Sequence, residues 1–195
     1  ESVIAKDPNN LLAHYKLAQI YYTLADRSLS RSEKLNYFEQ GLNYAKKAIT
    51  LDSNSVWAHF WYMANLGGTT QLRGIFSSLA SISEVKKELD LMLKLDPNNV
   101  WVLNAQANYY LELPAFLGGD LNKSIDLANR ALKLNPNYTI LYITLAKAYI
   151  KKKDYTQARL YLKQLLDIKN PYPFSDYLID DRPTAIKLLD QIKDK

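Results

Sequence analysis

Asp7-Pro8-Asn9-Asn10 is the first of four short turns of nearly the same sequence, and their repetition decides the fold. The other three turns are Asp52-Ser53-Asn54-Ser55, Asp96-Pro97-Asn98-Asn99 and Asn135-Pro136-Asn137-Tyr138. Each follows an apolar stretch with helical periodicity, so each predicts the end of one helix and the start of the next. A degenerate fifth copy begins at Asn170, and successive copies start 45, 44, 39 and 35 residues apart. Repetition at this spacing is typical of a stacked helical-repeat protein.

The residue types in the turn explain why it recurs between helices. Proline has no backbone N–H and clashes with the carbonyl four residues earlier in a helix, so Asp-Pro or Asn-Pro ends a helix. The Asn or Ser side chain that follows can accept a hydrogen bond from the first turn of the next helix. The chain is therefore predicted to reverse direction at each copy and to form antiparallel helix pairs.

Residues 136–170 place particular residue types at fixed positions of a repeat. If Pro136 is position 32 of a repeat of about 34 residues, large side chains fall on positions 4, 7, 11, 24 and 27, and small ones on positions 8 and 20. The residues at these positions are Tyr142, Leu145, Ala146, Tyr149, Ala158, Leu162 and Leu165. The pattern resembles the tetratricopeptide repeat (TPR) family. That resemblance implies an all-α fold, a right-handed α-solenoid of antiparallel helix pairs with inserts and a C-terminal capping helix.

The same positions, counted from the other turns, predict one structural domain built from several repeats. Residues 1–8 are the end of a truncated upstream repeat. TPR-like repeats follow at 9–53, 54–97, 98–136 and 137–170, of which 54–97 is the most degenerate. Residues 171–195 are a loop and a capping helix, because stacked repeats need a covered end. That helix is predicted to open at Asp181 or Thr184, and Asp181 is interpreted as its cap.

Repeats longer than 34 residues predict inserts between the first and second helix of each pair. The first insert, near residues 27–33, is polar and is expected to lengthen the second helix. The second, at 67–82, has helical apolar spacing and predicts an extra short helix over residues 67–80. The third, at 113–120, is an apolar loop in which Asp120 can cap the following helix. The glycine pairs Gly67-Gly68 and Gly118-Gly119 are both interpreted as loop residues.

Composition excludes several classes of function. The chain has 195 residues and no cysteine, which removes disulfides, thiol catalysis and thiolate metal sites. No apolar stretch approaches the roughly 20 residues that cross a bilayer. The net charge of +5 comes from lysines spread along helices beside acidic residues. Because no basic stripe with interleaved aromatic residues is present, binding to nucleic acid is disfavoured.

The two histidines do not indicate an enzyme. His14 and His59 both fall at position 4 of the first helix of their repeats, where the TPR family places a large, half-buried side chain. No metalloprotease helix motif, nucleophile elbow or phosphate-binding loop is present. The sequence therefore predicts no catalytic residue, no metal site and no cofactor.

Because no catalytic residue or metal site is predicted, the function is expected to be binding on the concave surface of the solenoid. The TPR resemblance implies that positions 2, 5, 9 and 12 of each first helix line a ligand-binding groove. Two of the three tryptophans, Trp57 and Trp101, fall there at equivalent positions. The predicted groove residues are Tyr15, Gln19, Tyr22, Trp57, Phe60, Trp101, Asn104, Asn108, Ile143 and Lys147. Whether the groove is open or filled by the chain's own inserts is left as two alternatives.

A narrower resemblance rests on two segments. Residues 57–62, with the glycine-containing insert after them, and residues 113–120 look like bacterial exported TPR proteins. These include accessory components of tripartite periplasmic transporters, and regulator of microtubule dynamics proteins share a similar insert. This resemblance implies a bacterial periplasm or envelope location and a small apolar ligand, with a cytoplasmic location as the alternative.

Two functions follow from these observations. The first is a non-enzymatic scaffold that binds a protein or peptide segment in the aromatic groove. The alternative is a periplasmic accessory or carrier protein that binds a small apolar ligand for a transport system. The sequence identifies neither the partner nor the oligomeric state.

Overall fold

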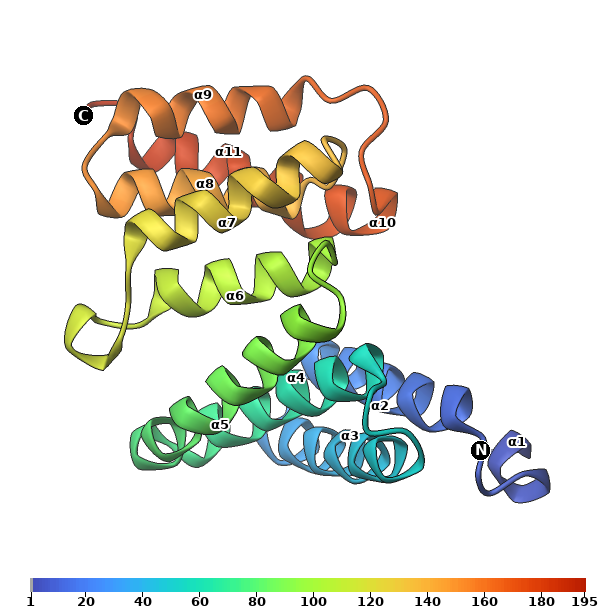
Figure 1. Ribbon diagram of the computed structural model, residues 1–195. Helices are drawn as coiled ribbons and strands as arrows, with labels where there is room; N and C mark the ends of the chain where they lie inside the picture. Colours follow the sequence, from blue (N-terminus) through green and yellow to red (C-terminus); the bar gives the residue numbers. More distant parts are fainter. Residues whose placement is uncertain (1) are drawn as a thin grey trace. The chain divides into compact units, whose positions relative to one another are not determined.

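The computed structural model describes residues 2–195 and consists of helices joined by short connections (Figure 1). The described residues contain no β-strand, which confirms the all-α prediction. The chain divides into two compact units, which meet in the sequence between Pro97 and Asn98. This point is also the predicted boundary between the second and third repeats.

Unit 1, which ends at Pro97, is a series of helices in which each packs on the next. Its helices are α1 (Ser2–Lys6), α2 (Leu11–Arg27), α3 (Arg31–Leu51), α4 (Val56–Arg73) and α5 (Ile75–Leu95). In addition, α2 packs against α4. TPR-like stacking requires such contacts between every second helix, because the first helices of successive repeats then form one layer.

Unit 2, from Asn98 onward, follows the same plan. Its main helices are α6 (Val100–Glu112), α7 (Leu121–Leu134), α8 (Ile140–Lys151) and α9 (Tyr155–Leu166). A 3₁₀ turn η1 (Ala115–Leu117) lies between α6 and α7. The chain then continues through α10 (Phe174–Asp176), the π-helical turn η2 (Tyr177–Asp181) and α11 (Arg182–Gln191). The arrangement is all-α and TPR-like, as predicted.

The recurring turn satisfies backbone groups at both of its ends. Its first side chain accepts a hydrogen bond from the backbone N–H two residues later, at 3.2 Å for Asp7, 2.9 Å for Asp52 and 3.1 Å for Asn135. Its last side chain caps the next helix in three of the four copies, those ending at Asn10, Ser55 and Asn99. The turn is therefore both a stop and a start signal for helices, as its residue types predicted.

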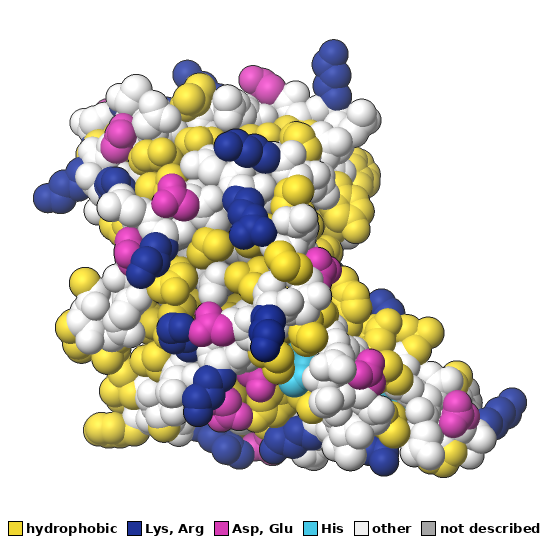
Figure 2. Space-filling model, viewed as in Figure 1, with side chains coloured by type: hydrophobic (Ala, Val, Ile, Leu, Met, Phe, Trp, Pro, Cys, Tyr) yellow, Lys and Arg dark blue, Asp and Glu magenta, His cyan; other side chains and the backbone are white. Residues whose placement is uncertain are grey.

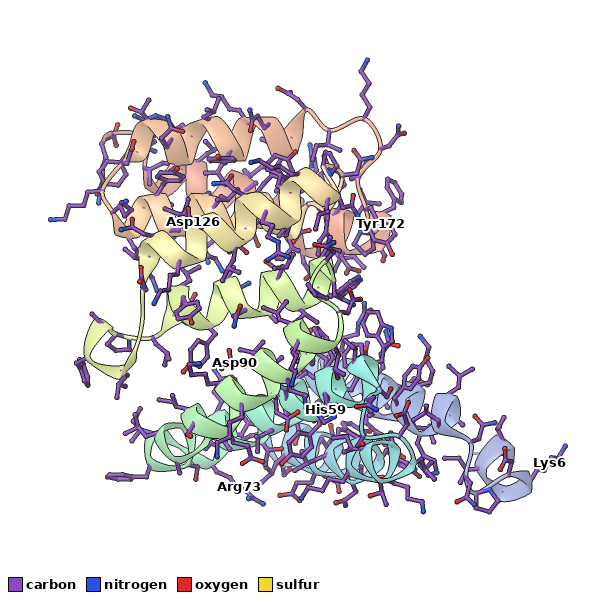
Figure 3. The ribbon with its side chains drawn as sticks, in the orientation of Figure 1. Lys6, His59, Arg73, Asp90, Asp126 and Tyr172 are labelled. Atoms are coloured by element: carbon purple, nitrogen blue, oxygen red, sulfur yellow. The ribbon has the colours of Figure 1, made fainter. Side chains whose placement is uncertain are left out.

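A buried side chain from the following helix also holds the turn. Nε2 of His14 donates to the carbonyl oxygen of Pro8 at 2.8 Å, and Nε2 of His59 donates to that of Ser53 at 3.0 Å. Figure 3 labels His59 among the side chains. In the fourth repeat the Tyr142 hydroxyl donates to the carbonyl oxygen of Pro136 at 2.8 Å. All three donors lie six residues after their acceptor. Both histidines thus have a structural role.

Residues 67–80 differ from the prediction of a separate short helix. Helix α4 continues to Arg73 and α5 begins at Ile75, with only Gly74 between them at a φ of 108°. Gly67 and Gly68 therefore lie inside a helix and are not loop residues. A Cβ atom on Gly68 would come within 2.5 Å of the Phe38 ring, so close packing of α4 on α3 requires this glycine.

The loop at 113–120 agrees with the prediction. Gly118 has a φ of 96°, which favours glycine, and a Cβ on Gly119 would collide with the carbonyl oxygen of Leu113. The Asp120 carboxylate caps α7 by accepting from the backbone N–H groups of Asn122 and Lys123 at 3.0 and 3.1 Å.

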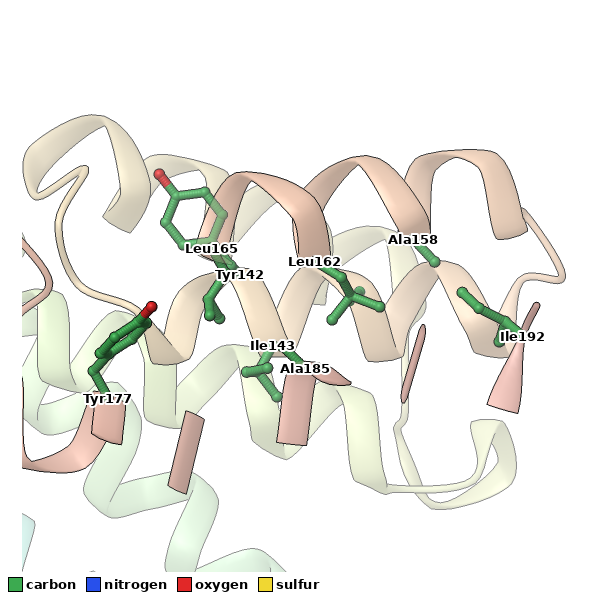
Figure 4. Packing of buried hydrophobic residues seen from close by; sticks show 9 residues of the cluster. Tyr142, Ile143, Ala158, Leu162, Leu165, Tyr177, Ala185 and Ile192 are labelled. Atoms are coloured by element: carbon green, nitrogen blue, oxygen red, sulfur yellow. The ribbon is translucent and has the colours of Figure 1, made fainter. Parts of the chain in front are cut away.

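The C-terminal segment, residues 171–195, packs on α8 and α9. Tyr177, Ala185 and Ile192 join a buried cluster with residues of both helices (Figure 4), and Arg159 Nη1 donates to the Ile192 carbonyl at 3.0 Å. Asp181 was predicted to cap α11, but its side chain makes no capping bond. Instead it is 3% exposed and accepts from the Thr139 hydroxyl at 2.6 Å.

The surroundings of Asp181 change its protonation. Burial raises the pKa of its carboxyl group to about 6, and the hydrogen bond from Thr139 opposes that rise. The carboxylates of Asp176 and Asp180 also raise the pKa, whereas the Lys147 ammonium lowers it. Desolvation is therefore the dominant cause.

The glycine pair provides a test of helix packing. Gly68→Ala should destabilise the protein by about 1–3 kcal/mol, because the new methyl group would displace the buried Phe38 ring. Gly67→Ala should stabilise it by about 0.5–1 kcal/mol, because alanine favours a helix and no atom lies within 4 Å of the added Cβ. Urea unfolding of both variants measures the difference, and equal effects would contradict the packing argument.

The His59–Glu88 pair makes stability depend on pH. Nδ1 of His59 lies 2.5 Å from Oε2 of Glu88, and this hydrogen bond raises the pKa of His59, although burial opposes the rise. The pair's contribution is complete below the unfolded pKa of about 6.5 and is lost as pH rises through the higher folded value. Glu88→Gln should lower the pKa of His59, as measured by NMR titration, and flatten this pH dependence. Glu84→Gln, one turn away on α5, is the control that leaves it in place.

Asp181 predicts a pH dependence of the same sign in a lower pH range. Since its folded pKa is raised, stability should fall as pH rises from about 4 to about 6 and then level off. Asp181→Asn keeps an acceptor for Thr139 but cannot ionise, so it should be more stable than wild type at pH 7 by on the order of 1–3 kcal/mol. Chemical unfolding at pH 4.5 and pH 7 compares the two proteins. An unchanged pH dependence in the variant would rule out this assignment.

Candidate partner-binding surfaces

The predicted groove residues of unit 1 form one patch, here called the unit 1 aromatic face. It consists of Tyr15, Gln19 and Tyr22 on α2 with Trp57 and Phe60 on α4. All five side chains are partly exposed. Because α2 and α4 pack directly on each other, residues 45 apart in the sequence share this face.

A buried tryptophan lies beneath the face. Trp61 is 8% exposed and forms a small core with Ala18 and Ala45, against which Tyr15, Tyr22 and Phe60 pack. The Phe60 and Trp61 rings meet edge to face, with centroids 5.2 Å apart at 81°. The sequence prediction did not include Trp61, although its place directly after Phe60 in an aromatic run is a visible signal.

The other ring contacts are also tilted rather than stacked. The Trp57 and Phe60 centroids are 5.8 Å apart at 67°, and those of Tyr22 and Trp61 are 5.8 Å apart at 53°. Such edge-to-face pairs stabilise each other beyond the area they bury. Trp57, Phe60 and Tyr22 therefore each have a ring contact at this face while staying partly exposed.

Few charged groups lie at this face. Lys16 Nζ donates to Gln19 Oε1 at 3.0 Å and lies 5.9 Å from the centroid of the Tyr15 ring. At the other end of α2, Asp26 acts on Tyr22: burial raises the pKa of the Tyr22 hydroxyl, and the Asp26 charge raises it further. A cation thus lies at one end of the face and an anion at the other.

In unit 2 the predicted groove residues are engaged with the protein itself. The Trp101 ring packs on Tyr138, with centroids 5.1 Å apart. The Thr144 hydroxyl donates to Asn104 Oδ1 at 2.9 Å, and Asn108 Nδ2 donates to the Thr144 hydroxyl oxygen at 3.3 Å. These bonds link α6 to α8, so the two amide side chains serve helix packing.

Two further predicted residues of unit 2 lie at the C-terminal segment. Ile143 is 2% exposed because it belongs to the cluster that Tyr177 and Ala185 complete, so the structure places it in the core and not on a surface. Lys147 is partly exposed and close enough to Asp181 to influence its carboxyl group.

Neither unit shows an arrangement typical of catalysis. Both ring nitrogens of His59 are hydrogen-bonded, one to the Ser53 carbonyl and one to Glu88. Among residues 2–195, no group of three or more histidine and acidic side chains could hold a metal ion. On the face drawn in Figure 2, basic and acidic side chains are interspersed. No helix in the described part of the chain has the length and apolarity to span a membrane.

Comparison with known proteins identifies relatives. A family model described as regulator of microtubule dynamics protein 1-3 matches residues 2–112, and a tetratricopeptide repeat model matches residues 115–173. The second match confirms the TPR prediction, while the resemblance to bacterial exported proteins stays a prediction.

Regulator of microtubule dynamics protein 1 from Bos taurus is 24% identical over 170 residues, which cover 78% of this chain and 54% of the relative. The Homo sapiens protein is 22% identical over the same shares. The chain thus spans about half the length of the curated relatives it matches. Since the first family model matches more than half of its residues, the chain belongs to the regulator of microtubule dynamics protein 1-3 family.

Proposed function

We propose that this chain is a non-catalytic scaffold whose unit 1 aromatic face binds a segment of a partner protein. TPR-type repeats and membership of the family indicate a protein-interaction role. The unit 1 aromatic face is our candidate surface for that interaction, since aromatic side chains are enriched among the residues that dominate binding energy at protein interfaces.

One observation carries the proposal. The rings of Tyr15, Trp57 and Phe60 are partly exposed, yet Tyr15 and Phe60 pack on the core that contains Trp61, and Trp57 packs edge to face on Phe60. Rigid aromatic side chains lose little conformational entropy on binding, so they favour a specific partner over nonspecific contact. Contiguous apolar surface of this kind marks interaction sites in soluble proteins.

The scaffold is favoured over the carrier of a small apolar ligand. The carrier function predicts a closed apolar cavity under residues 67–80 and the loop at 113–119, whereas residues 67–80 form the end of α4 and the start of α5. Their exposed apolar side chains include Ile75 and Phe76, at 66% and 85% exposure. These exposed side chains favour a surface role for residues 75 and 76.

The name of the relatives supplies the first partner to test, which is polymerised tubulin. Trp57→Ala together with Phe60→Ala should weaken co-sedimentation with microtubules by about 30-fold or more, because loss of interface anchors costs about 2 kcal/mol. The control is Phe76→Ala, which removes an exposed aromatic side chain of unit 1 outside the face. Circular dichroism checks that each variant is folded.

Equal losses in the double variant and the control would contradict a role for the aromatic face. Unchanged binding in the double variant would contradict it as well. If wild-type protein does not sediment with microtubules, the same variants are compared on partners captured by crosslinking through the face.

A further inference from the structure

In the fourth repeat, the chain itself covers the surface that the repeat pattern assigns to binding. Position 5 of this repeat is Ile143, which is buried in one cluster with Tyr177 of η2 (Figure 4), and η2 packs on α8. At the same position in unit 1, Tyr15 and Phe60 are partly exposed. The C-terminal segment therefore occupies in unit 2 the kind of surface that stays open in unit 1.

The start of the C-terminal segment is joined to unit 2 by a short backbone pairing. The Tyr172 N–H donates to the Asn137 carbonyl at 2.8 Å, and the Thr139 N–H donates to the Tyr172 carbonyl at 3.1 Å. These bonds form an isolated bridge, and the flanking residues Pro171 and Pro173 have no N–H that could extend it. Separating the segment here breaks few backbone hydrogen bonds.

A buried carboxyl group makes the next contact. Asp181 is 3% exposed, and it accepts at 2.6 Å from the hydroxyl of Thr139, which is fully buried at the start of α8. The π-helical turn η2 buries both Tyr177 and Asp181, and such turns are rare and frequent at functional sites. Because burying an ionised carboxylate is costly, this contact depends on the protonation of Asp181.

The titratable and charged groups around Asp181 come from several elements. They are Asp176 on α10, Asp180 on η2, Lys147 on α8, the exposed Arg182 at the start of α11, and the hydroxyl groups of Tyr138 and Tyr172. Burial is the largest cause of the raised pKa of Asp181, and the two neighbouring carboxylates raise it further. The Thr139 hydrogen bond and the Lys147 ammonium oppose the rise. The docked segment therefore favours the neutral acid.

The direction of the pH effect follows from these surroundings. In the docked segment the pKa of Asp181 is raised to about 6 by burial, whereas an exposed aspartate has a pKa near 4. Below about pH 4 the carboxyl group is protonated in both states, so the contact is complete. As the pH rises from about 4 to about 6 the contact weakens, and above that range the effect levels off.

We propose that the C-terminal segment is a pH-sensitive latch over the groove side of α8, closed through Asp181 and Thr139 in acid and opening more often near neutral pH. Opening exposes Ile143 and the apolar residues around it, and so adds a binding surface to unit 2. This inference does not depend on the unit 1 aromatic face.

Hydrogen exchange of the whole chain, followed by mass spectrometry, tests the latch. After correction for the chemical exchange rate, the amides of η2 and α11 should lose protection by about 10-fold or more between pH 4.5 and pH 7. The amides of α6 and α7 should keep theirs. Equal protection of η2 and α11 at both pH values would overturn the proposal. An equal loss throughout unit 2 would overturn it as well, because the whole unit would then be opening.

Variants assign the effect to the carboxyl group. Asp181→Asn should remove the pH dependence of exchange in η2 and α11, whereas Asp190→Asn, on the exposed side of α11, should leave it in place. Asp176→Asn combined with Asp180→Asn alters only exposed residues, and it should move the midpoint of the protection loss to lower pH.

Two results from these variants would contradict the latch. One is a pH dependence that survives in Asp181→Asn, and the other is an unmoved midpoint in the double variant. If Asp181→Asn does not fold, the double variant decides alone.

Discussion

A hydrogen bond from a buried side chain to a carbonyl of the preceding turn anchors the first helix in three of the four repeats. His14, His59 and Tyr142 each make it across six residues, whereas the equivalent position of the repeat at 98–136 holds the buried, apolar Leu103. The bond satisfies a carbonyl that the turn would otherwise leave without a helical partner, and it fixes how the next helix leaves the turn. In unit 1, these bonds fix the start of α2 and of α4, and thereby the direction in which the aromatic side chains of both helices lie.

Sequence reasoning predicted the parts of the fold that local chemistry determines. The turns, the cap at Asp120 and the positive φ of Gly118 all depend on neighbours within a few residues. The loop prediction for Gly68 was wrong because this glycine is required by the Phe38 ring, 30 residues earlier. The sequence alone does not distinguish a glycine required by packing from one required by a loop. Asp181 was misread for the same reason, since its partner Thr139 is 42 residues away.

The candidate site was predictable to a similar extent. The position of a residue within its repeat predicted that α2 and α4 residues share one side of unit 1, and α2 and α4 pack directly on each other. It could not show that Asn104 and Asn108 bind Thr144, nor that residues after position 170 bury Ile143. The position of a residue within its repeat predicts on which side of the helix its side chain lies. Tertiary packing decides whether another element covers that side chain.

Residues at one repeat position differ between the two units, and this difference favours unit 1 for the interaction that we propose. Position 5 is Tyr15 and Phe60 in unit 1, and Asn104 and Ile143 in unit 2. The first two are partly exposed over Trp61, whereas Asn104 is hydrogen-bonded to Thr144 and Ile143 lies under the C-terminal segment. A side chain that is always covered can be purely apolar, but one that alternates between solvent and a partner benefits from an aromatic ring with a polar edge. The residue types therefore agree with the packing: unit 2 uses this position for its core and for bonds between α6 and α8, and the partly exposed rings of unit 1 favour the binding role that we propose for them.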